Sequence, residues 1–255
     1  MDLTEPHQSE SAFMHTECLR KRYGAIEAVR DVSMSVNRGE IVGLVGPNGA
    51  GKTTAFYMIT GLIRPDGGSI YVDKGSGLLT DVTYMPIYKR VRMGFGYLSQ
   101  EPSVFRSLSV AENIQVALEQ KELSRIQQRE RLDELLNQYN LWDIRGHLGS
   151  VLSGGQRRRT EIARILATEP SLLLMDEPFA SIDPVSVEKV KEAMLELKKD
   201  GLGIIVTDHS VRDIFDISDR TYIMLRGQVI ASGDADFLIN HPLVRKEYLG
   251  NKFRL

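Results

Sequence analysis

The run Gly46-Pro47-Asn48-Gly49-Ala50-Gly51-Lys52-Thr53 has the residue types and the spacing that phosphate binding requires. It fits the pattern of a glycine, four residues, a second glycine, a lysine and a serine or threonine. Glycines let successive backbone N–H groups turn toward a phosphate, and Lys52 can reach the β and γ phosphates of a nucleotide. Thr53 can supply a hydroxyl to magnesium, and Thr54 belongs to the same candidate site. An ordinary glycine turn before a helix is the alternative, and the strand and helix expected on either side disfavour it.

Two consecutive acids, Asp176 and Glu177, follow an apolar run over residues 172–175. A phosphate-binding loop of this kind needs a carboxylate to hold its metal. Asp176 is therefore expected near the magnesium, directly or through water, and Glu177 is expected to polarise the water that attacks the γ phosphate. Two acids that simply end a strand at the surface are the alternative, which is weak beside the loop. The two features together predict a protein that binds ATP with Mg²⁺ and hydrolyses it.

A second phosphate-binding helix start is expected at Leu152-Ser153-Gly154-Gly155-Gln156, because these residues precede a predicted helix over 157–166. One nucleotide cannot need two such cradles. With this run between the phosphate loop and the acid pair, the chain resembles the ATPase subunits of ABC transporters, whose signature sequence is LSGGQ. The resemblance covers nearly the whole chain.

The resemblance implies roles for four further residues. Tyr23 matches the aromatic residue that stacks on adenine, although an ordinary strand tyrosine would look the same. Gln100 matches the glutamine that senses the metal and the attacking water. Asp183 matches the loop that touches the partner subunit, and it can also cap the helix that Pro184 begins. His209 matches the switch histidine that contacts the γ phosphate, whereas a lone histidine at a strand end is more often structural.

The resemblance also implies partners. Two copies are expected to close head to tail, with ATP between the phosphate loop of one copy and residues 153–156 of the other. Motion would pass through a helical block, roughly residues 100–151, to transmembrane transporter subunits. Such partners are implied because no stretch of the sequence approaches the roughly 18 apolar residues of a membrane helix. The chain is expected to be cytoplasmic and to lie peripherally on the cytoplasmic face of the inner membrane through its membrane partners.

Several short runs of this sequence are similar to those of the ATPases of lipopolysaccharide export. They comprise Tyr57-Met58, Phe105-Arg106, Leu108-Ser109-Val110, Glu177-Pro178-Phe179-Ala180, Asp183-Pro184, Ser186-Val187, and the ending Tyr248-Leu249-Gly250 to Phe253-Arg254-Leu255. The ATPase of a branched-chain amino-acid importer is the close alternative, and the ending argues against it. A soluble ABC protein of ribosomes or DNA repair would carry two cassettes or long coiled-coil insertions. A non-hydrolysing scaffold fits poorly with Glu177 and His209. Residues 74–90 look longer than the equivalent stretch in that export family.

The strands and helices expected around these residues alternate along the chain. This order predicts an α/β fold with a mostly parallel sheet. One ABC ATPase domain is expected over 16–255, with an antiparallel β subdomain, a helical subdomain at about 101–160 and a flexible tail over 1–15. Strands are expected at 29–36, 40–45, 93–98, 171–175 and 203–207, with an early antiparallel pair within 18–36 and a hairpin of 222–225 and 228–231. Helices are expected at 53–61, 109–121, 124–139 and 185–199, and residues 141–151 are expected to complete the helical block.

The composition argues against a nucleic-acid-binding protein and against a disulfide-bonded one. The 255 residues carry a formal net charge of -2, so no strong positive field favours nucleic acid. Cys18 is the single cysteine, which rules out an internal disulfide and fits a reducing compartment.

Overall fold

The computed structural model describes residues 12–73, 77–250 and 253. Strand β1 (Met14–Tyr23) begins inside the predicted tail. Phe13 is 2% exposed and Met14 is fully buried, because both belong to an apolar core under the antiparallel strands. The predicted tail of residues 1–15 is therefore too long by its last four residues, and its first eleven lie outside the described residues.

All the described strands belong to one ten-stranded sheet, in the order β5-β4-β1-β2-β10-β9-β3-β8-β7-β6. At one end of the sheet the strands are antiparallel: β1, β2 (Ile26–Val36), β4 (Gly67–Asp73) and β5 (Leu79–Asp81). The parallel part contains β3 (Ile41–Val45), β6 (Phe95–Leu98), β7 (Leu172–Asp176), β8 (Gly203–Thr207) and β9 (Arg220–Leu225), and β9 forms a hairpin with β10 (Gln228–Gly233). The predicted fold class, the early antiparallel pair and the final hairpin are confirmed.

The central parallel strands are apolar on both faces, since each face packs on its own core. In β7, Leu172 and Leu174 point into the core around α1, whereas Leu173 and Met175 point into the core under the opposite helices. Period-two alternation explains why a continuous apolar run reads as a strand covered on both sides. The first polar residue of β7, Asp176, comes at the end of the strand.

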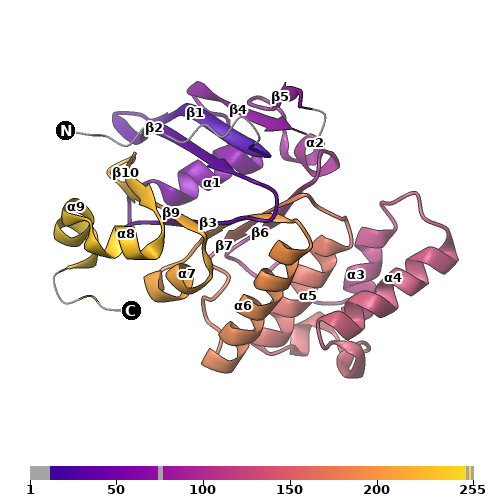
Figure 1. Cartoon of the computed structure of the whole chain (residues 1–255). Helices are drawn as coiled ribbons and strands as arrows, with labels where there is room; N and C mark the ends of the chain where they lie inside the picture. The colour runs from indigo at the N-terminus through magenta and orange to yellow at the C-terminus, as the bar shows by residue number, and fades with distance from the viewer. Residues whose placement is uncertain (1–11, 74–76, 251–252, 254–255) are drawn as a thin grey trace.

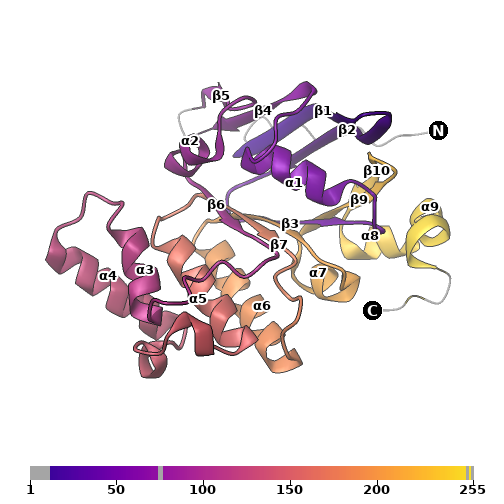
Figure 2. The same ribbon diagram turned by 180° about the vertical axis from the view of Figure 1, so that it is seen from behind.

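Helix α1 (Lys52–Thr60) lies between the parallel and the antiparallel parts of the sheet (Figures 1 and 2). It follows β3 after the glycine-rich loop, as the sequence predicts. Phe56, Met58 and Ile59 are fully buried, so both parts of the sheet hold the helix in place. The helix ends at Gly61, whose φ of +82° suits glycine.

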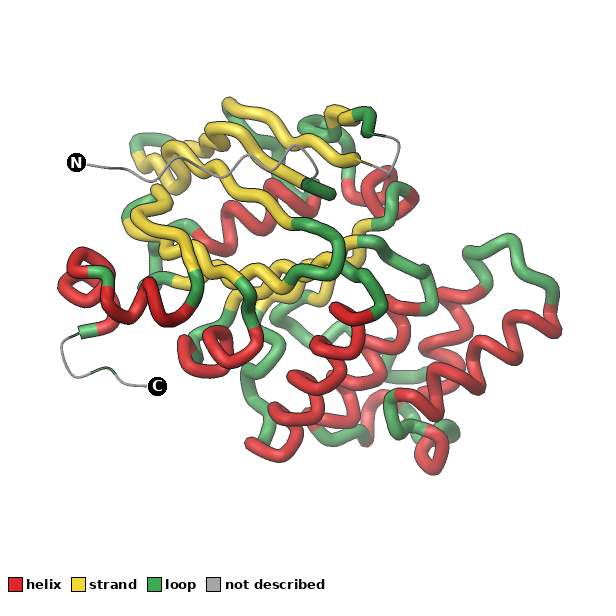
Figure 3. The backbone as a smooth tube through the Cα atoms, in the orientation of Figure 1, coloured by secondary structure: helices red, strands yellow, loops and turns green. Residues whose placement is uncertain are grey.

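Most of the remaining helices lie on the opposite side of the parallel sheet, as the red segments of Figure 3 show. They are α3 (Val110–Leu118), α4 (Arg125–Gln138), α5 (Gly154–Leu166), α6 (Pro184–Lys199) and α7 (Val211–Ile217). Of these, α3 and α4 are packed beyond α5. Ser109 and Glu112 form a capping box at the start of α3. Residues 141–151 form two single 3₁₀ turns, Trp142–Ile144 and Gly149–Val151, joined by loop.

Several short elements have no sequence prediction: α2 (Ile87–Arg92), α7, α8 (Ala235–Asn240), α9 (Pro242–Val244) and a π-helical turn (Arg245–Leu249). Each is shorter than two full turns, so its apolar period is too brief to read. The stretch 74–90, which looks longer than in the export family, contains β5 and the start of α2, and residues 74–76 lie outside the described part. Among the described residues, no helix has the length and apolarity to cross a membrane.

Candidate functional site

The phosphate loop joins β3 to α1, and its glycines are required by close backbone approaches. A Cβ on Gly46 would lie 2.0 Å from the carbonyl oxygen of Met224, and one on Gly51, at φ +99°, would lie 2.3 Å from that of Ala28. Inside the loop, Lys52 Nζ donates to the carbonyl oxygens of Gly46 (2.7 Å) and Pro47 (3.1 Å). The ammonium group therefore already lies within the curve of the loop.

A cavity of about 450 Å³ opens beside this loop. It brings together residues from segments far apart in the sequence. Of the predicted site residues, Tyr23, Asn48, Gly49, Ala50, Gly51, Lys52, Thr53, Thr54, Asp176, Glu177 and His209 line it. Tyr23 is half exposed at the cavity wall, and Lys21 Nζ lies 5.7 Å from the centroid of its ring.

Asp176 ends β7 as a buried carboxylate with an unpartnered oxygen. The residue is 1% exposed, and its Oδ2 accepts no hydrogen bond. Burial, reinforced by the charge of Glu177, raises the pKa of Asp176 to about 6. Burial also lowers the pKa of Lys52, although Glu177 and Asp176 oppose that effect. A lysine and a carboxylate thus share a desolvated corner of the cavity.

Glu177 is held from both sides. Gln100 Nε2 donates to its Oε2 at 2.7 Å, and His209 Nε2 lies 2.8 Å from its Oε1. The backbone of Glu177 adopts a φ of +48°, and its N–H donates to the carbonyl oxygen of Thr207 at 2.8 Å. Gln100 does not line the cavity itself, so it reaches the site through Glu177. The carboxylate at the end of a rigid strand is therefore held in one orientation by two loops.

The second motif lies at the start of α5, away from this cavity. Ser153 caps α5 in a capping box with Gln156. Asp183 caps α6, accepting from the N–H of Ser186 at 3.0 Å and from its hydroxyl at 2.6 Å. A Cβ on Gly155 would lie 2.3 Å from Ser186 Oγ, so the two helix starts are packed against each other. None of Ser153, Gly154, Gly155, Gln156 and Asp183 lines the phosphate-loop cavity.

Comparison with protein families gives a match over residues 29–180 to the model described as "ABC transporter". That is more than half of the chain. The chain belongs to the ABC transporter family. Within the family it is an ATP-binding subunit that hydrolyses ATP, and the predicted resemblance is confirmed.

Similar ABC proteins cover almost the full chain. "Lipopolysaccharide export system ATP-binding protein LptB" of Haemophilus influenzae is 46% identical over 96% of this chain and 100% of its own length. The protein with the same name in Escherichia coli K12 is 44% identical over 93% of this chain and 97% of its own length. A "Probable ABC transporter ATP-binding protein" of Azorhizobium caulinodans is 49% identical over 93% of this chain and 83% of its own length.

Solved ABC cassettes have the same fold. The ADP conformation of one ATP-binding cassette superposes with a TM-score of 0.82 at 28% identity, covering 94% of this chain and 99% of that one. A dimeric cassette in a post-hydrolysis state, bound to ADP and Pi, superposes with a TM-score of 0.75 at 26% identity, covering 87% and 98%.

Arg158 of this ABC ATPase is a site residue that the sequence analysis missed. Its buried guanidinium donates to the backbone oxygens of Ser99 (2.8 Å), Asp176 and Glu177 (both 3.1 Å). It also forms an ion pair with the buried Glu161 at 3.2 Å. Arg158 thereby ties the residue before Gln100 to both acids. A signal was present in the sequence. Arg158 shares one face of α5 with Ile162 and Leu166, which are both apolar, and this face is the one expected to be buried.

Asp208 is a second missed residue. One of its oxygens accepts from the N–H of Phe179 at 3.0 Å, and the other accepts from the N–H of Ser210 at 3.1 Å. The carboxylate therefore joins the loop after Glu177 to the loop that carries His209. Its sequence signal was only its place directly after β8, which strand-end acids commonly share.

Proposed function

We propose that this chain is the ATP-hydrolysing subunit of a lipopolysaccharide-export transporter, working as an ATP-dependent dimer. One observation carries the catalytic part: a carboxylate beside the phosphate loop is held by a glutamine on one side and a histidine on the other. The transport part rests on relatives of that name, which are 44–46% identical over at least 93% of this chain.

Magnesium is supported by the chemistry of the donors. Asp176 Oδ2 is buried and unpartnered at the cavity that Thr53 also lines, and hard oxygen ligands suit this cation. Among the described residues, no group of three or more His, Cys, Asp or Glu side chains could form a metal cage. The protein would thus supply only part of the shell, from Asp176, Thr53 and Gln100. When bound, the ion neutralises charge that develops on the phosphate oxygens.

Glu177 is proposed as the general base toward the attacking water. Its orientation depends on Gln100 and His209, so a shift of either loop would move the carboxylate. Lys52 would bind the β and γ phosphates, the loop amides of residues 46–51 would surround them, and Tyr23 would stack on the adenine. His209 would contact the γ phosphate as well.

A second copy is proposed because the two phosphate-binding helix starts do not share a cavity. Residues 153–156 and Asp183 form one surface, and residues 46–54 form another. Head-to-tail closure of two copies would place ATP between the phosphate loop of one and Ser153 of the other. A dimeric cassette among the similar structures supports this arrangement.

A Glu177→Gln variant tests the catalytic assignment. The amide keeps the size of the side chain but cannot accept a proton, so the hydrolysis rate is expected to fall by roughly 10²-fold or more. ATP binding should persist, and gel filtration with MgATP should show a stable dimer. Phosphate release and nucleotide affinity are measured side by side. Hydrolysis at the wild-type rate would exclude Glu177 as the base.

The transport assignment requires its own experiment. The subunit is expected to lie on the cytoplasmic face of the inner membrane through transmembrane partners. Affinity purification of the full chain from membranes, followed by identification of the partners and of bound lipid, should recover two transmembrane export subunits with lipopolysaccharide. Recovery of importer-type subunits with a periplasmic binding protein would contradict the export proposal while leaving ATP hydrolysis intact.

A further inference from the structure

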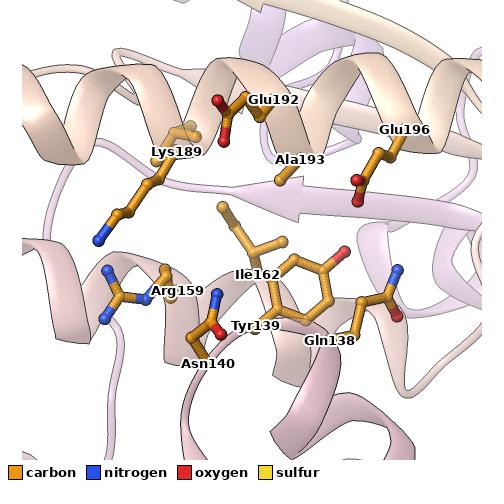
Figure 4. A pocket seen from close by; sticks show the side chains of 10 residues that line it. Gln138, Tyr139, Asn140, Arg159, Ile162, Lys189, Glu192, Ala193 and Glu196 are labelled. Carbon is orange, nitrogen blue, oxygen red and sulfur yellow. The ribbon is translucent and has the colours of Figure 1, made fainter.

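A second cavity lies away from the phosphate loop, at the junction of the C-terminal end of α4 with α5 and α6 (Figure 4). Its volume is about 100 Å³, and none of its lining residues lines the phosphate-loop cavity. The polar residues that matter are Tyr139 and Asn140 after α4, Arg159 on α5, and Lys189, Glu192 and Glu196 on α6.

Two polar atoms at this cavity are buried without a hydrogen-bond partner. They are Tyr139 Oη, on a residue that is 4% exposed, and Arg159 Nε. Buried polar groups almost always have partners, and leaving one unpaired is costly. Burial, reinforced by Glu196, raises the pKa of Tyr139, so its hydroxyl remains a neutral donor at physiological pH. A polar ligand in this cavity would supply hydrogen-bond partners for both atoms.

One end of the cavity is cationic. Figure 4 shows the Lys189 ammonium and the Arg159 guanidinium pointing toward the same end, where the Asn140 amide also lies. Within the described part of the chain, neither cation has a carboxylate within ion-pair distance. Asp183 acts on Arg159 only from farther away, and burial lowers the pKa of this guanidinium. Two like charges at one place favour an anion between them.

The other end is anionic. Figure 4 shows the Glu196 carboxylate at this end, whereas the Glu192 carboxylate lies beside the Lys189 stem, and no ion pair within the described residues involves either of them. Figure 4 shows the Tyr139 hydroxyl pointing toward the turn of α6 that carries Ala193 and Glu196. Carboxylates only accept hydrogen bonds, so an ammonium group is the complementary donor for this end.

We propose that this cavity binds a small bipolar molecule, with an oxyanion between Lys189 and Arg159 and an ammonium group against Glu196 and the Tyr139 hydroxyl. At about 10–15 Å³ for each water molecule, the volume of about 100 Å³ suits a ligand of roughly seven to ten non-hydrogen atoms. The bound molecule would contact α5, which begins with residues 153–156, and α6, which Asp183 caps. Binding at this cavity does not depend on which molecule the transporter exports.

Calorimetry on the full chain, saturated with MgADP to fill the phosphate loop, tests the proposal. Phosphoethanolamine and γ-aminobutyrate are the probes, carrying an ammonium with a phosphate and with a carboxylate respectively. We expect saturable one-to-one binding of at least one probe, and the probe preferred identifies the oxyanion. Inorganic phosphate and ethanolamine, which each match one end only, should bind at least tenfold more weakly. Equal affinity for inorganic phosphate would overturn the bipolar assignment.

Three variants locate the binding. Lys189→Gln and Glu196→Gln each remove one charge from an exposed side chain, and each should weaken the probe about tenfold because a charge-assisted hydrogen bond is lost. Lys199→Gln makes the same charge change on α6 outside the cavity and should leave affinity unchanged. Binding that Lys189→Gln does not weaken, or that Lys199→Gln weakens equally, would place the ligand elsewhere. No saturable binding of either probe would leave the cavity as a site for water and overturn the proposal.

Discussion

At the scale of single residues, Asp176 is a buried carboxylate surrounded by charges of both signs. Its neighbours pull in both directions, since Glu177 and Asp208 disfavour the ionised carboxylate while Arg158 and Lys52 favour it. Burial is the largest influence, and the pKa of about 6 follows. Desolvation of this carboxylate costs stability in the metal-free protein, and the proposed magnesium would offset that cost.

The pH dependence of stability follows from this pKa. The folded state holds the proton of Asp176 up to about pH 6, whereas the unfolded chain loses it near 3.8, so this group destabilises the folded protein increasingly as pH rises between these values. Asp176→Asn in the metal-free protein should therefore raise the free energy of unfolding by about 1–2 kcal/mol at pH 7.5, and by roughly half as much at pH 5. Urea unfolding at both pH values measures the difference. An equal gain at both would contradict the raised pKa.

At the scale of elements, α1 must stay in place for the phosphate loop to keep its shape. Arg90 on α2 is 1% exposed, and its guanidinium donates to the carbonyl oxygens of Met58 (2.7 Å) and Ile59 at the end of α1. It also donates to those of Thr83 and Met85, both at 2.9 Å. A cation at a helix C-terminus satisfies carbonyls that have no partner within the helix. The short α2 thus anchors the far end of the phosphate-loop helix.

Arg90→Met should be strongly destabilising, because it leaves several buried carbonyl oxygens without donors. The expected loss in the free energy of unfolding is about 3 kcal/mol or more. For a protein of this size, that corresponds to a fall in the melting temperature of roughly 6–12 °C. Arg92→Met on the same helix is the control, since Arg92 is exposed and should change stability little. A similar melting temperature for both variants would contradict the anchoring role.

At the scale of the whole molecule, the distribution of motifs over two surfaces predicts complementation between inactive copies. Lys52→Ala removes a phosphate-loop ligand, and Ser153→Arg blocks the opposite surface. A mixed dimer of the two variants would contain one intact shared site and one site damaged on both sides. Since half of randomly formed dimers are mixed, roughly a quarter of the wild-type ATPase rate should return, although each variant alone is inactive.

The matched control mixes Lys52→Ala with Glu177→Gln. These two changes lie on the same surface, so every site in the mixed dimer keeps one defect and no activity should return. Both mixtures are assayed in complexes with the membrane subunits. Absence of recovery with Ser153→Arg would contradict a site shared between two copies, while ATP binding by one copy would remain possible.

How much of the site the sequence predicts depends on how local each feature is. The helix starts at Ser109, Ser124 and Ser153 each form a capping box within four residues, which a sequence window contains in full. Arg158 escaped prediction because its acceptors come from residues 59 and 18–19 positions away. The short helix α2 escaped because Arg90, its most buried residue, is held by tertiary hydrogen bonds instead of apolar periodicity.

The sequence by itself determined the phosphate loop, the acid pair and the strand-to-helix order around them, because each depends on residues adjacent along the chain. Only the tertiary structure decided that Gln100 and His209 hold the two oxygens of Glu177, since the parallel strands that bring them together are far apart in sequence. It also decided that residues 153–156 pack beside Asp183, away from the phosphate loop. Packing of α5 against α6 sets that separation. Gly155 lies so close to Ser186 that the starts of the two helices are held against each other.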